Sequence, residues 1–127
     1  DRSGEIARKY GMISNDISTT ETVRNVFIID PNGIVRTILI YPMNVGRFIP
    51  EILRIIQALQ MADCAKSSTA ANWIPNQPVI ISPPKTFCEL QERQQEILKN
   101  RNGINWYLSF KEPPKNCIDN GNSNCIE

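Results

Sequence analysis

The stretch that decides the fold is TVRNVFIIDPNGIVRTILIYP, residues 22–42, which predicts two β-strands joined by a tight turn. The first arm, Val26–Asp30, is almost wholly apolar, as expected of a strand that is buried on both faces. The PNG sequence that follows suits a turn, because proline presets φ and Asn-Gly accepts positive φ. The second arm, Ile34–Tyr41, mixes polar with apolar residues, as does a strand near a sheet edge, and Pro42 ends it.

Helical patterns stand on both sides of this hairpin. Ser3–Tyr10 predicts a short helix that Gly11 ends. Glu51–Met61 has apolar residues at helical spacing, and Pro50 suits the first turn of that helix. The order helix, loop, β-hairpin, helix predicts an α/β (α+β) chain with the second half of a thioredoxin-like fold.

The character of the chain changes after Ala62, where prolines and polar residues become frequent. We expect short elements with few apolar residues here: a strand over Val79–Ile81, a polar helix over Thr86–Asn100, an extended aromatic segment over Ile104–Phe110, and a mobile end over Lys115–Glu127. This part of the chain has too few apolar residues for a core of its own, so we infer that a second subunit holds it. Residues 1–62 are therefore predicted to form the thioredoxin-like part, and residues 63–127 an extended C-terminal dimerisation arm.

Composition excludes several classes of function. The formal net charge of the 127 residues is +1, so no electrostatic field draws the chain to nucleic acid or to an anionic membrane. No apolar run has the length of a membrane span. The chain has no histidine, which excludes Ser-His-Asp and Cys-His catalysis within it and removes the commonest metal ligand.

The four cysteines are Cys64, Cys88, Cys117 and Cys125, and no two of them form a CxxC pair. A zinc site or a disulfide scaffold would show closer spacing. We therefore expect mostly free thiols, no metal and a reducing, cytoplasmic setting. A cysteine-based zinc module is a third hypothesis, which this wide spacing does not favour.

A resemblance to a known family rests on several strings together: TVRNVFIIDPNGIVR, then YPMNVGRFIPEILRIIQALQ, then ANW with a later PP. They resemble the peroxiredoxins (the alkyl hydroperoxide reductase / thiol-specific antioxidant family), most closely the one-Cys-like subgroup. The likeness is good over about residues 1–84 and looser beyond. It implies a thioredoxin-like peroxidase that reduces hydrogen peroxide and organic hydroperoxides, uses a thiol reductant and no cofactor, and forms a homodimer or higher homo-oligomer.

The resemblance also implies where the reactive cysteine stands. The family's peroxidatic cysteine lies in a PxxxTxxC motif, which is absent from this sequence. We expect it upstream of Asp1, in which case this chain is the C-terminal half of the enzyme and is inactive alone.

Two catalytic arginines carry over from the family, Arg24 just before the buried strand and Arg47 before the second helix. The chemistry suits arginine, because a nearby cation lowers the pKa of a thiol and a guanidinium fork can hold both peroxide oxygens. An arginine beside a strand is more often an ordinary surface group, so only the resemblance singles these two out.

The cysteines depart from the family pattern. Archaeal-type tails flank a short aromatic stretch with cysteines, and here Gly103 and Ser109 stand at those places. Cys117 and Cys125 lie further on and are the possible resolving or redox cysteines, whereas Cys64 and Cys88 are expected to be structural thiols.

Trp73, Trp106 and Tyr107 are interpreted as apolar anchors that fasten the arm to a partner. The competing function for the whole chain is a non-catalytic thioredoxin-like interaction or dimerisation module, in which Arg24 and the arm only bind a partner.

Overall fold

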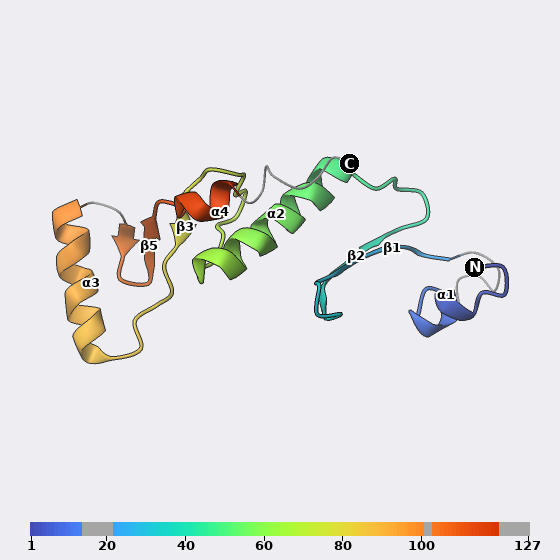
Figure 1. The fold of residues 1–127 in the computed structure, drawn as a ribbon, viewed down its shortest axis with the longest axis horizontal. Helices are drawn as coiled ribbons and strands as arrows, with labels where there is room; N and C mark the ends of the chain where they lie inside the picture. The colour runs from blue at the N-terminus through green and yellow to red at the C-terminus, as the bar shows by residue number, and fades with distance from the viewer. Residues whose placement is uncertain (14–21, 101–102, 120–127) are drawn as a thin grey trace. The chain divides into compact units, whose positions relative to one another are not determined.

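The computed structural model describes residues 1–13, 22–100 and 103–119 (Figure 1). The chain divides into two units, Asp1–Ile49 and Pro50 onward, and each is described by itself. Among the residues described, no helix is both long and apolar enough to span a membrane.

The first unit begins with α1 (Glu5–Lys9), shorter at both ends than the predicted helix. Its first turn is held from outside the helix, because the Asp1 carboxylate accepts a hydrogen bond from the Ala7 N–H at 2.7 Å. Glu5 near the N-terminus and Lys9 near the C-terminus suit the helix dipole. The end of α1 contacts the sheet through Tyr10, whose ring meets Phe27 edge-on at 4.9 Å.

The predicted hairpin is confirmed. Strands β1 (Arg24–Ile29) and β2 (Val35–Tyr41) pair antiparallel, with Arg24 opposite Tyr41. Asp30 organises the turn: its carboxylate accepts hydrogen bonds from the N–H groups of Asn32 and Ile34, at 2.9 and 3.0 Å, and forms an ion pair with Arg36 at 3.6 Å. Gly33 supplies the positive φ of 79° that the turn requires.

The burial of β1 differs from the prediction. The strand was expected to be buried on both faces, yet its side chains are half-buried or exposed. In the described residues the hairpin is a two-stranded sheet, so neither strand has a second neighbour and much apolar surface stays open. The large exposed apolar side chains of this hairpin are Ile29, Ile34, Val35, Ile38 and Ile40.

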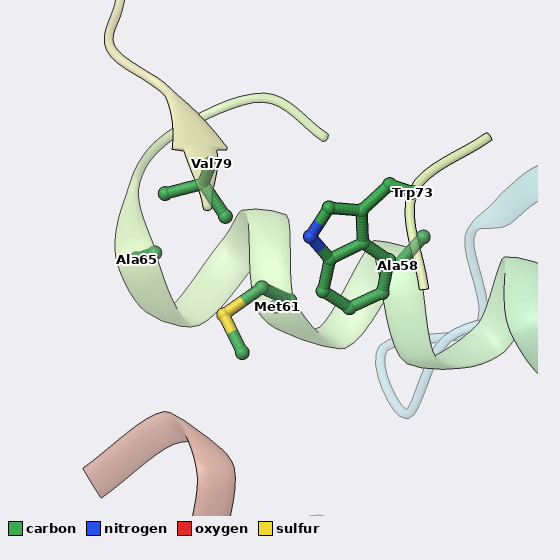
Figure 2. Packing of buried hydrophobic residues seen from close by; sticks show 5 residues of the cluster. All are labelled: Ala58, Met61, Ala65, Trp73 and Val79. Atoms are coloured by element: carbon green, nitrogen blue, oxygen red, sulfur yellow. The ribbon is translucent and has the colours of Figure 1, made fainter. Parts of the chain in front are cut away.

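The second unit is built on α2 (Ile49–Ala65), which is longer than the predicted helix and has Pro50 in its first turn. Its buried side chains meet residues from the following loop and strand in one cluster. Figure 2 shows the five members of this cluster: Ala58, Met61, Ala65, Trp73 and Val79. Trp73 is 1% exposed and Val79 is 0% exposed, so they form the centre of the core.

Trp73 is held by polar contacts as well as by packing. Its indole N–H donates to the Gln77 carbonyl oxygen at 3.0 Å, so the loop closes around the ring. Its own carbonyl oxygen accepts a hydrogen bond from Arg54 of α2 at 3.0 Å. Arg54 also donates to both carboxylate oxygens of Glu51, at 2.6 and 2.8 Å. Helix and loop are thereby joined through one guanidinium.

The rest of the second unit contains short elements. They are β3 (Val79–Ile80), α3 (Phe87–Asn100), β4 (Gly103–Asn105), β5 (Leu108–Lys111) and α4 (Lys115–Asp119). The strands form one antiparallel sheet in the order β3-β5-β4. The segment predicted to be extended and aromatic thus forms a hairpin, and α4 is a helix where only a mobile end was expected. Residues 120–127 of that predicted end lie outside the described residues.

The interpretation of the aromatic anchors changes for one residue. Trp73 lies in the core of its own unit and is therefore no anchor for a partner. Trp106 and Tyr107, in the turn between β4 and β5, are 39% and 54% exposed and meet edge-on at 5.5 Å.

We expect Trp73→Ala to lower the free energy of unfolding by roughly 3–5 kcal/mol, because it removes the largest buried side chain and leaves a cavity. Trp106→Ala, which removes a partly exposed ring, is the matched control and should change stability far less. Urea unfolding followed by far-ultraviolet circular dichroism measures both. Equal losses in the two variants would contradict the placement of Trp73 in the core.

We expect the contribution of the Glu51–Arg54 pair to depend on pH. The hydrogen bond from Arg54 lowers the pKa of Glu51 below its ordinary value of 4.5. The stabilisation is therefore complete above pH 4.5 and is lost as the pH falls through the lowered pKa. Wild type should have a higher Tm than Glu51→Gln at neutral pH, and the gap should close in acid. In an Arg54→Gln background, the Glu51→Gln substitution should change Tm little at any pH. A Tm difference between wild type and Glu51→Gln that persists in acid would show that the ion pair is not its source.

Candidate functional site

The open end of the hairpin brings the two predicted arginines together. Arg24 is the first residue of β1 and pairs with Tyr41, the last residue of β2, so both lie at the end opposite the turn. Beyond Tyr41 a tight turn, in which the Val45 N–H donates to the Pro42 carbonyl oxygen at 3.0 Å, leads toward Arg47.

A direct contact fixes Arg47 to this end. Its Nη2 donates to the Asn25 carbonyl oxygen at 3.4 Å, one residue after Arg24. Two arginines that are 23 positions apart in the sequence thus lie beside the same strand start. Both residues are exposed, and within the described part of the chain neither is paired with a carboxylate. An exposed guanidinium group can donate several N–H hydrogen bonds to a negatively charged or peroxide ligand.

A third arginine of the hairpin serves a different purpose. Arg36 stands near the turn and forms an ion pair with Asp30, whose side chain organises that turn. The structure therefore separates a structural arginine at one end of the hairpin from two exposed arginines at the other.

Asn25 adds a polar group beside the arginines. Its side-chain oxygen Oδ1 is buried, and the described residues offer it no hydrogen-bond partner. Its backbone carbonyl accepts from Arg47, and its backbone N–H donates to Val23 at 3.1 Å. Sequence reasoning did not single out Asn25, because an asparagine within an apolar strand has no spacing signature.

The cysteines differ from the expectation of mostly free thiols. Cys64, in the last turn of α2, forms a disulfide with Cys117 of α4, across 53 positions of sequence. Cys88, in the first turn of α3, is an exposed free thiol. Cys125 lies outside the described residues. Sequence spacing gave no signal for the Cys64–Cys117 pair, because only the fold of the second unit brings α4 to the end of α2.

Gly103 and Ser109, which stand where the resemblance places cysteines, both have a role in packing. Ser109 is fully buried, and its hydroxyl accepts a hydrogen bond from Arg93 of α3 at 2.7 Å. At Gly103 an added Cβ would lie 2.8 Å from the Ser109 Cα, so no side chain fits there without movement of the backbone. Neither position offers a thiol, and both serve the contact between β4 and β5.

The second unit also has an open, mostly apolar groove. Its walls come from the loop before β3 and from the β4–β5 hairpin, and include Pro78, Ile104, Phe110 and Lys111. None of the described residues that line it is a cysteine.

Comparison with known proteins agrees with the resemblance. The family of the C-terminal domain of 1-Cys peroxiredoxin matches residues 58–96. The chain is 50% identical over 115 residues to peroxiredoxin 2 of Caldanaerobacter subterraneus subsp. tengcongensis, covering 88% of this chain and 50% of that protein. It is 43% identical over 108 residues to a peroxiredoxin of Methanosarcina mazei, covering 85% of this chain and 49% of the other.

Solved structures agree as well. A yeast mitochondrial 1-Cys peroxiredoxin, studied for its thiol resolving mechanism with glutathione and thioredoxin systems, superposes with a TM-score of 0.65 at 36% identity, over 86% of this chain and 52% of that one. A cysteine-to-serine mutant of peroxiredoxin 6 of Arenicola marina superposes with a TM-score of 0.68 at 29% identity, over 91% and 55%. The mixed α/β structure thus matches part of the thioredoxin-like peroxiredoxin fold.

The chain spans about half the length of the curated relatives it matches. By sequence and by structure it belongs to the peroxiredoxin family and carries the family's C-terminal 1-Cys domain.

Proposed function

We propose that this chain is the C-terminal portion of a thiol-dependent peroxidase that reduces hydrogen peroxide and organic hydroperoxides. The observation that carries the proposal is that Arg24 and Arg47 both lie at the open end of the hairpin, in a chain whose relatives are peroxiredoxins. The whole protein would work with a thiol reductant in the cytoplasm.

The arginines would act on a cysteine that this sequence does not contain. A cysteine thiolate attacks one peroxide oxygen, the O–O bond breaks, and the products are a sulfenic acid and an alcohol or water. Negative charge moves from sulfur to the departing oxygen during this step. Two guanidinium groups can stabilise the thiolate first and the departing oxygen later, because each presents several donors in a fixed fork.

The second unit would build the subunit interface. Exposed apolar side chains on the β4–β5 hairpin, namely Ile104, Trp106 and Tyr107, are of the kind that protein interfaces bury. The division into a thioredoxin-like part, 1–62, and a dimerisation arm, 63–127, remains our prediction, as does a homodimer or higher homo-oligomer.

A resolving role for Cys117 or Cys125 also remains a proposal. Cys117 is bonded to Cys64, so it could attack a sulfenic acid only after this bond is reduced. Cys125, which lies outside the described residues, is the other candidate.

We expect Arg24→Ala in the full-length protein to lower kcat/KM for hydrogen peroxide about a hundredfold, equivalent to about 2.7 kcal/mol of transition-state stabilisation. The kcat/KM of Arg24→Lys should lie between those of wild type and Arg24→Ala, because lysine keeps the positive charge but lacks the forked set of N–H donors. Arg36→Ala is the control on the same hairpin and should keep its activity, because Arg36 binds Asp30 at the other end. Peroxide consumption at matched folding measures all three.

Unchanged activity of Arg24→Ala, with an active wild type, would leave Arg24 outside the active site. A wild type without peroxidase activity would favour the non-catalytic interaction module instead.

We expect the isolated chain to lack peroxidase turnover, because no PxxxTxxC motif is present to supply the attacking thiolate. The measurement is peroxide consumption by the purified chain with dithiothreitol, with each of its four cysteines replaced by serine in turn. Turnover that disappears with one of these replacements would show that the chain carries its own peroxidatic cysteine and would contradict the proposal.

A further inference from the structure

The Cys64–Cys117 disulfide is not itself a step of the peroxidase chemistry proposed above. Cys64 lies in the last turn of α2, and Cys117 lies in the middle of α4, with 5.9 Å between their Cα atoms. The bond joins the end of the core helix to the last element that the structure describes. We infer its role from the exposure of the two cysteine residues and from what else holds α4.

The two cysteines differ in exposure. Cys64 is exposed, whereas Cys117 is half-buried and packs against the cluster around Trp73. Thiol–disulfide exchange starts at the sulfur that an incoming thiolate can reach. An external thiol would therefore attack Cys64, and Cys117 would be the leaving group.

The disulfide ties α4 directly to the end of α2. Outside the helix itself, the described residues give α4 a local hydrogen bond from the Cys117 N–H to the Pro114 carbonyl oxygen at 2.9 Å. Pro113 is buried, so the chain is anchored just before α4 begins.

The neighbouring strand has its own attachments. In β5, Lys111 Nζ donates to the Ala65 carbonyl oxygen at 3.1 Å, and the Ser109 carbonyl oxygen accepts from the Ile81 N–H at 2.9 Å. These bonds do not depend on the disulfide. Without the disulfide, β5 keeps these attachments, whereas the described residues leave α4 with the packing of Cys117 against the core cluster and the local hydrogen bond to Pro114.

We propose that Cys64–Cys117 is a thiol–disulfide exchange site whose reduction by a dithiol releases α4 from α2. The reductant thiolate attacks Cys64 Sγ, the S–S bond breaks, and its electron pair goes to Cys117 Sγ, which takes up a proton. The second thiol of the reductant then displaces Cys64 and closes the reductant's own disulfide. Two electrons and two protons have passed to the protein.

Oxidised glutathione reverses the process. The Cys64 thiolate attacks one sulfur of glutathione disulfide and releases one glutathione thiolate, and the Cys117 thiolate then attacks Cys64 Sγ, releases the second glutathione thiolate and restores the bond. The site thus ties the position of α4 to the balance of thiols and disulfides. It consumes no peroxide and does not depend on the arginine site, so either proposal can fail without the other.

The first test uses the full chain, oxidised with glutathione disulfide or reduced with dithiothreitol. Peptide mapping without reduction should find the Cys64–Cys117 link after oxidation. Amide hydrogen exchange of the α4 peptide should rise about tenfold or more on reduction, with the β5 peptide unchanged. Cys88→Ser is the matched control and should behave as wild type, because Cys88 is an exposed free thiol. In Cys64→Ser, exchange of the α4 peptide should be fast under both conditions.

Several results would overturn the proposal. They are a missing Cys64–Cys117 link after oxidation, a link to Cys88 or Cys125 in its place, or α4 exchange that is equal in the oxidised and reduced wild type. The comparison within the wild type needs no variant, so a misfolded variant cannot hide the answer.

A second test locates the attacked sulfur. Brief treatment of the oxidised chain with glutathione, followed by alkylation and mass spectrometry, should place the mixed disulfide on Cys64. An adduct on Cys117 would overturn the assigned direction of attack.

Discussion

The second unit depends on the burial of Trp73 against one side of α2. The indole fills the space between Ala58 and Met61 of the helix and Val79 of the next strand (Figure 2). Its N–H is satisfied by Gln77 and its carbonyl by Arg54, so the ring is buried without an unpaired polar group. This one side chain thereby fixes the loop that leads from α2 to β3.

The first unit follows a different constraint. A two-stranded hairpin is marginal by itself in water, and this one exposes apolar side chains such as Ile38 and Ile40. The conformation of its turn is nevertheless stabilised, because Asp30 binds two backbone N–H groups and one guanidinium. The local sequence thus fixes the register, while the surface of the strands is suited to further packing. Such packing fits a chain that spans about half the length of its peroxiredoxin relatives.

The regular elements could be predicted from sequence because each has a local signal: the PNG turn, the helical spacing before Met61, and the polar helix α3. The features that were missed depend on tertiary structure. The turn at Trp106–Tyr107 has no glycine or proline to mark it, and α4 forms in a polar stretch that composition assigns to a loop. The Cys64–Cys117 pair has no spacing rule at all. The arginines were found only through family resemblance, because an exposed guanidinium carries no signal of its own.

The Cys64–Cys117 disulfide also changes the covalent connectivity of the molecule. Since it joins positions 53 residues apart, the chain from Cys64 to Cys117 is a closed covalent ring that contains α3 and the whole β4–β5 hairpin. Closing a ring of this size restricts the unfolded chain by roughly 4 kcal/mol in the chain-entropy description. A single cut by a protease anywhere inside the ring would leave the two pieces covalently joined, and they would separate only when the ring is opened by a reductant.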